Sequence, residues 1–377
     1  MKALRLHGVG DLRLADEPSP VPGPAEELVR VTAVGICGSD LHWHDESGIG
    51  DAVLTKPLIL GHEASGVIVA GPRAGQRVAL DPQLPCGACE TCAAGRGHLC
   101  PQVRFLGHSV TDGALRELLA WPATNLVPLP DAIDDVAGAM LEPLGVAIHA
   151  LGLARVRPGG SVAVLGCGPI GLLLVQLARA AGATLVVATD RLPHRVEAAR
   201  RLGAVATLVE GGAERDVLLE ATARRGVDAA IEIVGEDDAI ETAVILARPA
   251  GTVVVAGIPA GDHSTIAISL ARRKGLDLRF SRRMIRTYPR AIALVEAGLV
   301  EVSSLVTHRF AMADFGAAFR TAARRDGLKV IVFEQTADVL EKRFGFRVQE
   351  YGLRQVFTRV PGHPIMGLAA ENLRDWR

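Results

Sequence analysis

Four of the six cysteines in the chain lie close together, with the spacing Cys86-x2-Cys89-x2-Cys92-x7-Cys100. Zinc in a closed structural site takes four thiolate or imidazole ligands arranged as a tetrahedron. Each Cys-x2-Cys turn brings two thiolates to one ion, and two glycines in the longer interval let the chain return the fourth thiolate. The spacing therefore predicts a structural zinc site, against the alternatives of an iron–sulfur cluster or free thiols. Four protein ligands leave no open position for a substrate.

Further residues of metal-ligand type occur in three separate segments, GICGSDLHWH at 35–44, LGHEASG at 60–66 and LEPLG at 141–145. They are Cys37, His62, Glu63 and Glu142. A catalytic zinc site keeps about three protein ligands and one exchangeable position, which these side chains could supply. Spacing alone does not join them, because a lone cysteine is more often a small buried apolar residue and a lone histidine more often a satisfied loop residue.

A glycine pattern of the form G-x-G-x-x-G follows the apolar segment SVAVLG and opens a helical run. The pattern consists of Gly166, Gly168 and Gly171, with Pro169 and Ile170 between the last two glycines. In this context the glycines let the backbone approach a pyrophosphate, and the helix N-terminus attracts its negative charge. The alternative is a glycine turn in an α/β protein that binds no nucleotide.

An acidic residue is expected about 20 residues after such a motif, at the end of the second strand. Asp190 stands there, in the segment ATDR. A carboxylate at this point accepts hydrogen bonds from both ribose hydroxyls and repels a 2′-phosphate, so the sequence predicts NAD rather than NADP. Arg191 and Arg195 are the contrary evidence, because they could hold a phosphate; their other interpretation is a solvated helix start.

The elements that must position these residues change in type near residue 150. The first third contains short β-rich segments broken by Gly and Pro, such as 27–36 and 64–71, which indicate a β-rich body with long loops. From residue 150 onward, apolar strands alternate with helical runs, beginning with 161–166, 170–182 and 184–190. This alternation predicts a doubly wound parallel sheet with helices on both faces.

The totals favour a globular protein of two domains. The chain has 377 residues, of which 49% are hydrophobic and 22% charged, with a net charge of −1. Acids and arginines are interspersed, so nucleic acid is not an expected partner. The start of the chain lacks a signal-peptide pattern, and no apolar run reaches the roughly 18 residues of a membrane span. We therefore expect a soluble, cytoplasmic protein.

Taken together, these motifs resemble the zinc-containing medium-chain alcohol dehydrogenases, and within them the sorbitol and xylitol (polyol) dehydrogenase branch. CGSD, GHE, the cysteine segment, LEP and GxGPIG occur in the family's order over about residues 1–335. The resemblance implies a GroES-like catalytic domain at 1–148 and 275–335 and a Rossmann NAD-binding domain at 149–274. It leaves a C-terminal extension at 336–377 that matches neither domain.

The resemblance also implies the ligands of a second, catalytic zinc, so that each chain would hold two zinc ions. Cys37 and His62 match the family's thiolate and imidazole ligands. Glu63 matches the adjacent carboxylate, which is a direct ligand in this branch. Glu142 matches the glutamate of the EP motif, which lies close to the metal either directly or through the zinc-bound water.

The implied reaction is oxidation of a secondary alcohol, most simply a polyol or sugar alcohol, by NAD to a ketone. Ser39 matches the hydroxyl that passes the substrate proton onward, and His42 is a candidate for the next step. One alternative is a threonine-type or glucose-type zinc dehydrogenase; another is a non-catalytic zinc and dinucleotide-binding protein. A zinc-ribbon nucleic-acid binder is disfavoured, because Arg96 is nearly the only basic residue of the cysteine segment.

The resemblance to polyol dehydrogenases also points to substrate-binding residues. Arg283 matches an arginine that holds sugar hydroxyls, and Phe105 fits a position in the pocket wall. Met284 and Trp43 stand where tyrosines are usual, either as pocket residues that lack a hydroxyl or as ordinary packing. We expect a small alcohol or polyol as the only partner besides copies of the chain, in a homo-oligomer that is preferably a tetramer and alternatively a dimer.

Overall fold

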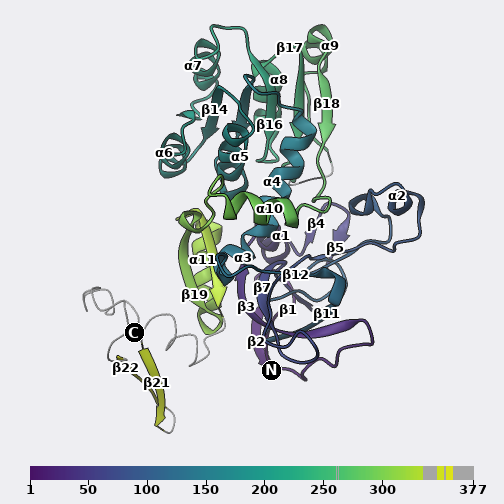
Figure 1. Cartoon of the computed structure of the whole chain (residues 1–377). Helices are drawn as coiled ribbons and strands as arrows, with labels where there is room; N and C mark the ends of the chain where they lie inside the picture. Colours follow the sequence, from purple (N-terminus) through teal and green to yellow (C-terminus); the bar gives the residue numbers. More distant parts are fainter. Residues whose placement is uncertain (260, 262, 334–345, 352–353, 360–377) are drawn as a thin grey trace. The chain divides into compact units, whose positions relative to one another are not determined.

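The computed structural model describes residues 1–259, 261, 263–333, 346–351 and 354–359 (Figure 1). The chain divides into two units, Met1–Val332 and Phe333–Arg377. In the second unit, strands β21 (Phe346–Tyr351) and β22 (Arg354–Arg359) pair antiparallel. The rest of the predicted extension at 336–377 lies outside the described residues.

A seven-stranded sheet forms the β-rich body that precedes and follows the cofactor-binding part in sequence. In spatial order its strands are β12 (Leu126–Pro128), β8 (Arg77–Leu80), β7 (Glu63–Ile68), β3 (Glu26–Gly35), β20 (Lys329–Phe333) and β19 (Val306–Ala311), with β11 (Leu118–Pro122) paired to β3. The short strands are β1 (Lys2–Leu6), β2 (Leu12–Asp16), β4 (Gly48–Ile49), β5 (Ala52–Val53), β6 (Leu58–Ile59), β9 (Gln83–Leu84) and β10 (Arg104–Phe105).

The core of this body is built from alternating apolar residues of its strands. Leu4 and Leu6 of β1 and Val29 and Val31 of β3 point into it and are almost fully buried, as the period of two along a strand requires. Trp43, from helix α1 (Gly38–Glu46), packs into the same cluster. The predicted β-rich catalytic domain is therefore present. Strands β3 and β7 lie at its centre, and they hold in place two of the loops that carry metal-ligand residues.

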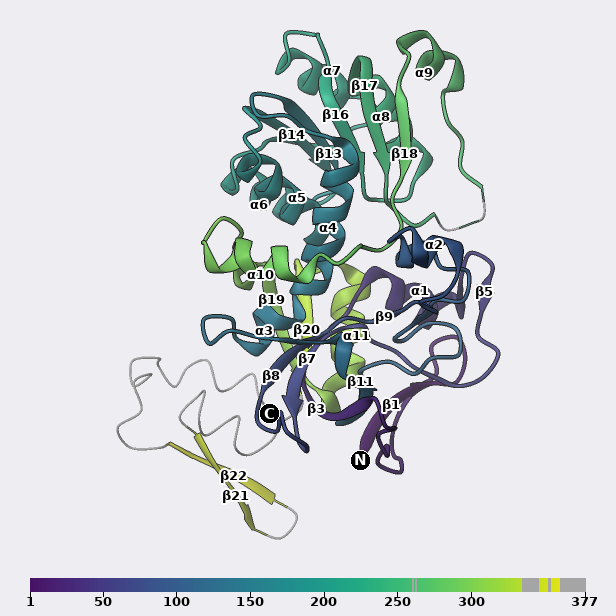
Figure 2. The same cartoon turned by 45° about the vertical axis from the view of Figure 1, so that its right-hand side comes forward.

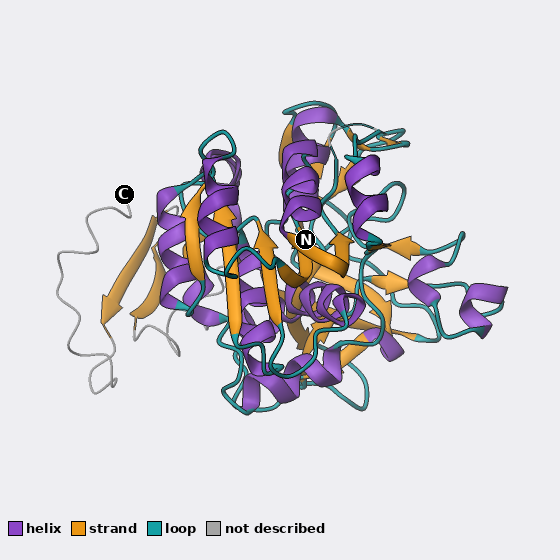
Figure 3. Cartoon of the chain, turned by 90° about the horizontal axis from the view of Figure 1, so that it is seen from above, coloured by secondary structure: helices purple, strands orange, loops and turns teal. Residues whose placement is uncertain are grey.

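A six-stranded parallel sheet forms the second half of this unit, in the order β15-β14-β13-β16-β17-β18. Its strands are β13 (Ser161–Leu165), β14 (Leu185–Asp190), β15 (Val205–Leu208), β16 (Val227–Glu232), β17 (Ala247–Val255) and β18 (Asp277–Phe280). The flanking helices, visible from above in Figure 3, are α5 (Pro169–Ala180), α6 (Pro193–Arg201), α7 (Ala213–Glu220), α8 (Asp237–Leu246) and α9 (Ile268–Lys274).

This order confirms the predicted Rossmann fold, in which β13 has β14 on one side and β16 on the other. The strand order reverses at that point, and ligands bind there, beyond the carboxyl ends of the strands. The sheet continues through β18, which lies beyond the predicted domain boundary at residue 274.

Helix α4 (Leu141–Ala154) connects the two halves of the first unit (Figure 2). It packs against α5, β16 and β17 of the parallel sheet and also against β7 and α10 (Tyr288–Glu296). The remaining helices are α2 (Glu90–Ala93), α3 (Asp135–Ala139) and α11 (Phe315–Arg324), with short 3-10 turns at Gly97–Leu99, Ala123–Asn125, Ser303–Leu305 and Met312–Asp314. Within the described residues, no helix has the length and apolar character of a bilayer span.

Candidate active site and metal centres

The four cysteines of the predicted structural site do come together. The Sγ atoms of Cys86, Cys89, Cys92 and Cys100 all lie within 4.8 Å of one another. The short helix α2 begins after Cys89, which places Cys89 and Cys92 on one turn with their Sγ atoms 3.4 Å apart. Hydrogen bonds from the Thr91 hydroxyl and the Cys92 amide lower the pKa of Cys89 to about 6, whereas burial and the neighbouring Cys89 raise the pKa of Cys92, so in the absence of a metal the cluster shares protons. The donor set fits a closed zinc site.

A second cluster joins three of the predicted catalytic ligands. The ligand atoms of Cys37, His62 and Glu63 lie within 4.8 Å of one another, although the sequence separates them. Cys37 is the N-cap of α1, and Glu63 begins β7. Gly61, with φ of +90°, turns the chain just before His62 and has no space for a Cβ, which would lie 2.8 Å from Val34. One thiolate, one imidazole and one carboxylate suit zinc with an open position.

Asp40 holds two of the ligand-bearing loops in place. Its carboxylate accepts hydrogen bonds from the amides of Cys37 (2.9 Å) and Gly61 (3.0 Å). The same group lies 3.6 Å from Nδ1 of His62. This leaves Nε2 free for a metal, which is the usual arrangement of a carboxylate behind a ligating histidine. The sequence analysis quoted Asp40 within CGSD but did not assign it a role.

The protonation of His62 bears on metal binding. Burial alone would lower the pKa of His62, but the Asp40 carboxylate outweighs it and raises the pKa well above its usual range. A metal must therefore displace a proton from His62. Ser39 Oγ lies 3.4 Å from Nε2, so its hydroxyl faces the position that a metal would occupy.

Glu63 has a buried cationic partner that the sequence gave no reason to expect. Lys329, the first residue of β20, forms an ion pair with Oε2 of Glu63, and both side chains are 3% exposed or less. Gly35, at the end of β3, packs against this pair. The only signal for Lys329 in the sequence was the presence of a lysine at the start of an apolar strand.

Glu142 lies in the first turn of α4 and is buried, but it is not part of the three-residue ligand cluster. Burial raises its pKa to about 7, His62 opposes that shift and Glu63 adds to it. Glu142 lines the same cleft as Cys37 and His62. This position suits a group close to the metal, and whether it is a direct ligand stays a prediction.

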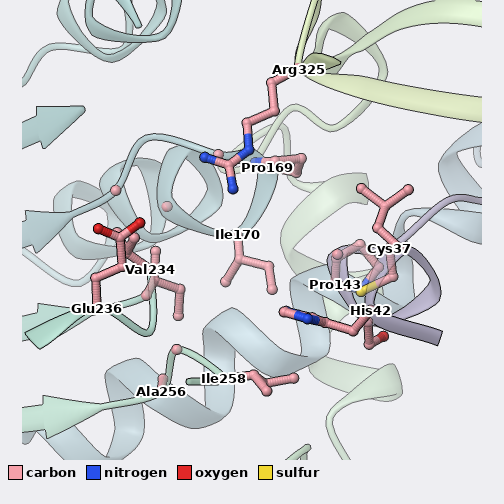
Figure 4. A pocket seen from close by; sticks show the side chains of 18 of the residues that line it. Cys37, His42, Pro143, Pro169, Ile170, Val234, Glu236, Ala256, Ile258 and Arg325 are labelled. Atoms are coloured by element: carbon pink, nitrogen blue, oxygen red, sulfur yellow. The ribbon is translucent and has the colours of Figure 1, made fainter. Parts of the chain in front are cut away.

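A cleft of roughly 1100 Å³ runs from the metal-ligand cluster to the glycine motif. Figure 4 shows Cys37 and His42 at one end, with Pro169 and Ile170 facing them across the cavity. Gly166, Gly168, Gly171, Asp190, Arg191 and Arg195 line the other end. The cleft thus joins the predicted catalytic and cofactor-binding residues in one continuous space.

The glycine motif has the geometry that dinucleotide binding requires. Gly166 has φ of +103°, and Gly168 is the N-cap of α5, whose first residue is Pro169. A Cβ on Gly171 would lie 1.8 Å from the carbonyl oxygen of Gly166, so only glycine fits there. The residues at this helix start line the cleft, so a pyrophosphate fits this turn.

Asp190 ends β14 and accepts hydrogen bonds from the amides of Cys167 (2.8 Å) and Leu192 (2.9 Å). Arg191 is paired with Glu236, a residue that the sequence analysis did not single out. Arg195 packs beside Gly168, and burial lowers its pKa. Glu236 thus provides a counter-ion for one of the two arginines that argued for NADP.

The predicted substrate residues fall into two groups. Phe105 and Arg283 line the cleft: the Arg283 guanidinium lies 4.2 Å from the Phe105 ring centroid, and that ring is 5.3 Å from the His62 ring. Trp43 is 1% exposed, packs in the core and is not among the residues that line the cleft, which favours the ordinary-packing interpretation of this residue. Met284 is also buried, with its sulfur accepting from Thr287, because packing against α4 fixes this turn.

His42 lines the cleft and its Nδ1 lies 3.1 Å from Glu46 Oε1. His108 also lines it and was missed by the sequence analysis, since an isolated histidine carries no spacing signal. Burial lowers the pKa of His108 to about 4, with nearby Arg283 adding to the effect. His108 is therefore neutral at physiological pH.

Two family models match the chain, the alcohol dehydrogenase GroES-like domain over residues 23–131 and the zinc-binding dehydrogenase over residues 169–297. Sorbitol dehydrogenase of Bacillus subtilis (strain 168) is 35% identical over 88% of this chain and 97% of its own length. The chain belongs to the zinc-binding medium-chain dehydrogenase family. It is a zinc-dependent, polyol dehydrogenase-like enzyme, as its motifs predicted.

Solved structures agree with this assignment. An Escherichia coli oxidoreductase/dehydrogenase of unknown specificity superimposes with a TM-score of 0.82 at 30% identity, over 89% of this chain and 99% of that one. A protein from Sinorhizobium meliloti 1021 described as a zinc-binding dehydrogenase, solved with NADP, gives a TM-score of 0.80 at 33% identity, over 88% and 98%. The fold therefore binds a dinucleotide, and the choice between NAD and NADP depends on this chain's own residues.

Proposed function

We propose that this enzyme oxidises a secondary alcohol of a polyol or sugar alcohol to a ketone, with NAD as hydride acceptor. The observation that carries the proposal is a single cleft with Cys37, His62 and Glu63 at one end and the glycine motif with Asp190 at the other. That arrangement lets an alcohol at the first end lie against a nicotinamide reaching from the second.

Zinc bound to Cys37, His62 and Glu63 would supply Lewis-acid polarisation, which lowers the pKa of an alcohol hydroxyl towards neutrality. NAD would supply the hydride acceptor, while the protein supplies orientation and exclusion of water. A second zinc, held by Cys86, Cys89, Cys92 and Cys100, would only stabilise the fold.

The side chains around the cluster supply the proton route. Ser39 faces the metal position and takes the proton of the substrate hydroxyl. His42 lines the same cleft and is hydrogen-bonded to the exposed Glu46, so it passes the proton towards solvent. Phe105 and Ile49 line the cleft with apolar surface, which keeps bulk water from the reacting carbon.

The preference for NAD is part of the proposal. Asp190 is positioned at the end of β14, where a carboxylate binds ribose hydroxyls and repels a 2′-phosphate. Glu236 supports the same preference, because it pairs with Arg191 and adds a second negative charge. The preference for NAD has to be tested by experiment, because a related protein was solved with NADP bound.

The direct test is NADH formation from a panel of polyols, simple secondary alcohols and sugars, with zinc-loaded and chelator-treated enzyme side by side. Zinc-dependent oxidation of polyols supports the proposal, and metal analysis should give two zinc ions per chain. Oxidation restricted to threonine or to glucose would replace it with another substrate class. Inactivity of a zinc-loaded enzyme across the panel would favour a non-catalytic role.

We also propose, from the family resemblance alone, that the chain forms a homo-oligomer, preferably a tetramer and alternatively a dimer. The mass in solution at micromolar concentration tests this directly. A monomer would overturn it.

A further inference from the structure

A buried carboxylate holds together two loops at the end of the parallel sheet. Glu232 is the last residue of β16, and its side chain is fully buried. One carboxylate oxygen, Oε1, accepts hydrogen bonds from the amides of Val234 and of Gly235 (2.6 Å for Gly235), in the loop that follows β16. The other oxygen, Oε2, accepts from the amide of Gly257 (3.3 Å), in the loop that follows the neighbouring strand β17. Glu232 therefore bonds both loops at once.

The two loops are packed so closely that a methyl group would not fit between them. A Cβ on Gly257 would lie 2.0 Å from the amide nitrogen of Gly235, and a Cβ on Gly235 would lie 2.1 Å from the carbonyl oxygen of Ile258. The loop after β16 also contacts the glycine motif, because a Cβ on Gly166 would lie 2.7 Å from the Val234 side chain. The segments that follow β13, β16 and β17 thus form one packed unit.

The same loops form one wall of the cleft, next to the point where the strand order reverses. The residues of the two loops that face the cavity are Ile233, Val234, Glu236, Ala256, Gly257 and Ile258. Figure 4 shows Val234 and Ile258 around the same cavity as Ile170 of the glycine motif. Glu232 lies behind this wall, since it is not among the residues that line the cleft.

The Glu232 carboxylate is balanced by backbone amides and not by a cation. In the part of the chain that the structure describes, no basic side chain forms an ion pair with Glu232. Burial raises the pKa of Glu232, and the amides of Gly235, Val234 and Gly257 oppose that shift. A buried carboxylate without these donors would be strongly unfavourable, so its burial favours the arrangement in which both loops are in place.

We propose that Glu232 is a positioning residue for the dinucleotide, because through the two loops it fixes the cleft wall against which the cofactor lies. This inference rests on the proposed function and adds to it a residue that does not itself line the cleft. A wall that is already fixed lowers the entropy lost when the cofactor binds, and so raises its affinity. It also holds the nicotinamide in one orientation towards the carbon that gives up the hydride.

The test measures NADH binding to the full-length, zinc-loaded protein by fluorescence titration. Glu232→Gln keeps the size of the side chain but turns an NH2 donor towards backbone amides. We expect the Kd of NADH to rise by about tenfold or more, as the loss of charge-assisted hydrogen bonds predicts. KM for NAD should rise with it, whereas KM for the alcohol at saturating NAD should be nearly unchanged, because no metal ligand belongs to this wall. Glu232→Asp keeps both acceptor oxygens on a shorter side chain and should recover part of the affinity.

Asp228→Asn is the matched control, because it changes a carboxylate near the other end of the same strand. Asp228 is the second residue of β16, and its carboxylate accepts hydrogen bonds from the amide and the hydroxyl of Ser161, both at 2.9 Å. It is not among the residues that line the cleft. Both variants should lower the melting temperature, but only Glu232→Gln should weaken NADH binding. A role of Glu232 in stability alone would not separate them.

Hydrogen exchange on the unaltered protein provides a readout that needs no variant. Saturating NADH should slow the exchange of amide hydrogens at 233–236 and at 256–258 together, since both loops belong to one wall. Protection of only one loop, an unchanged Kd in Glu232→Gln, or an equal rise of Kd in Asp228→Asn would each overturn the positioning role while the proposed function stands. If the unaltered protein does not bind NADH, the proposed function itself fails.

Discussion

Lys329 and Glu63 form a buried ion pair directly behind the metal-ligand cluster, although they are 266 positions apart in the sequence. Burial alone would lower the pKa of Lys329, but the charges of Glu63 and Cys37 raise it above its usual value. Lysine therefore balances negative charge that ligand residues concentrate in the core. In the metal-loaded enzyme, the zinc ion and Lys329 would together neutralise this negative charge.

Replacing Lys329 should lower the stability of the protein. Lys329→Met leaves Glu63 buried without a partner, and we expect the metal-free protein to lose about 3–5 kcal/mol of unfolding free energy. The loss should be smaller in the zinc-loaded protein, because the ion supplies positive charge to the same carboxylate. Denaturant unfolding with and without chelator measures both values. Lys56→Met, at an exposed position, is the control, and an equal small loss in both variants would contradict the argument.

Gly35 should not tolerate a methyl group. A Cβ there would lie 2.1 Å from Oε2 of Glu63 and 2.9 Å from Cε of Lys329, so Gly35→Ala must displace the ion pair. We expect a loss of about 1–3 kcal/mol in stability, with weaker zinc binding at the open site. Gly152→Ala, where nothing lies within 4 Å in helix α4, should be neutral or stabilising. Equal melting temperatures for the two variants would show that the site repacks freely.

The two cysteine sites should respond differently to substitution. Cys37→Ser removes a ligand of the open site, so we expect folded protein with one zinc per chain and turnover reduced by about a thousandfold or more. Cys92→Ser should instead lower thermal stability, because the closed site loses its metal and the cysteine segment loses the cross-link that the metal provides. Metal content, melting temperature and rate together distinguish the cases. Near-normal turnover by the Cys37 variant would remove that residue from the catalytic site.

Cofactor choice should depend on Asp190. Asp190→Ser removes the carboxylate that repels a 2′-phosphate, and we expect the NAD-to-NADP ratio of kcat/KM to fall by about 10- to 100-fold. Glu236→Gln frees Arg191 and should shift the ratio in the same direction by a smaller factor. Steady-state kinetics with both cofactors measures the ratios. A ratio that stays constant in the Asp190 variant would assign the selectivity elsewhere.

Asp81 should make stability depend on pH. Burial raises its pKa to about 6 in the folded protein, and the Gln83 amide only partly opposes this. Because the folded pKa is above the unfolded value, its stabilising contribution is complete below about pH 4 and is lost as pH rises through 6. Asp81→Asn should therefore gain up to about 2–3 kcal/mol over wild type between pH 4 and 7. The measurement is the melting temperature of both proteins between pH 4 and 7. A constant difference between them over that range would contradict the prediction.

The local motifs were predictable because each is built within one short segment. The four cysteines need only two tight turns to meet, and the glycine motif needs only a strand, a turn and a helix start. Backbone geometry over fifteen residues or fewer determines both arrangements, so type and spacing were sufficient. The alternation of strands and helices predicted the parallel sheet for the same reason.

The sequence by itself determined the closed cysteine site, the glycine turn and the two kinds of domain. Only the tertiary structure decided that Cys37, His62 and Glu63 meet, that Lys329 balances Glu63, and that Trp43 packs in the core rather than in the cleft. These outcomes depend on strand order and on which face of a helix is covered. Such contacts join residues far apart in the chain, and the free energy of packing, rather than local spacing, selects them.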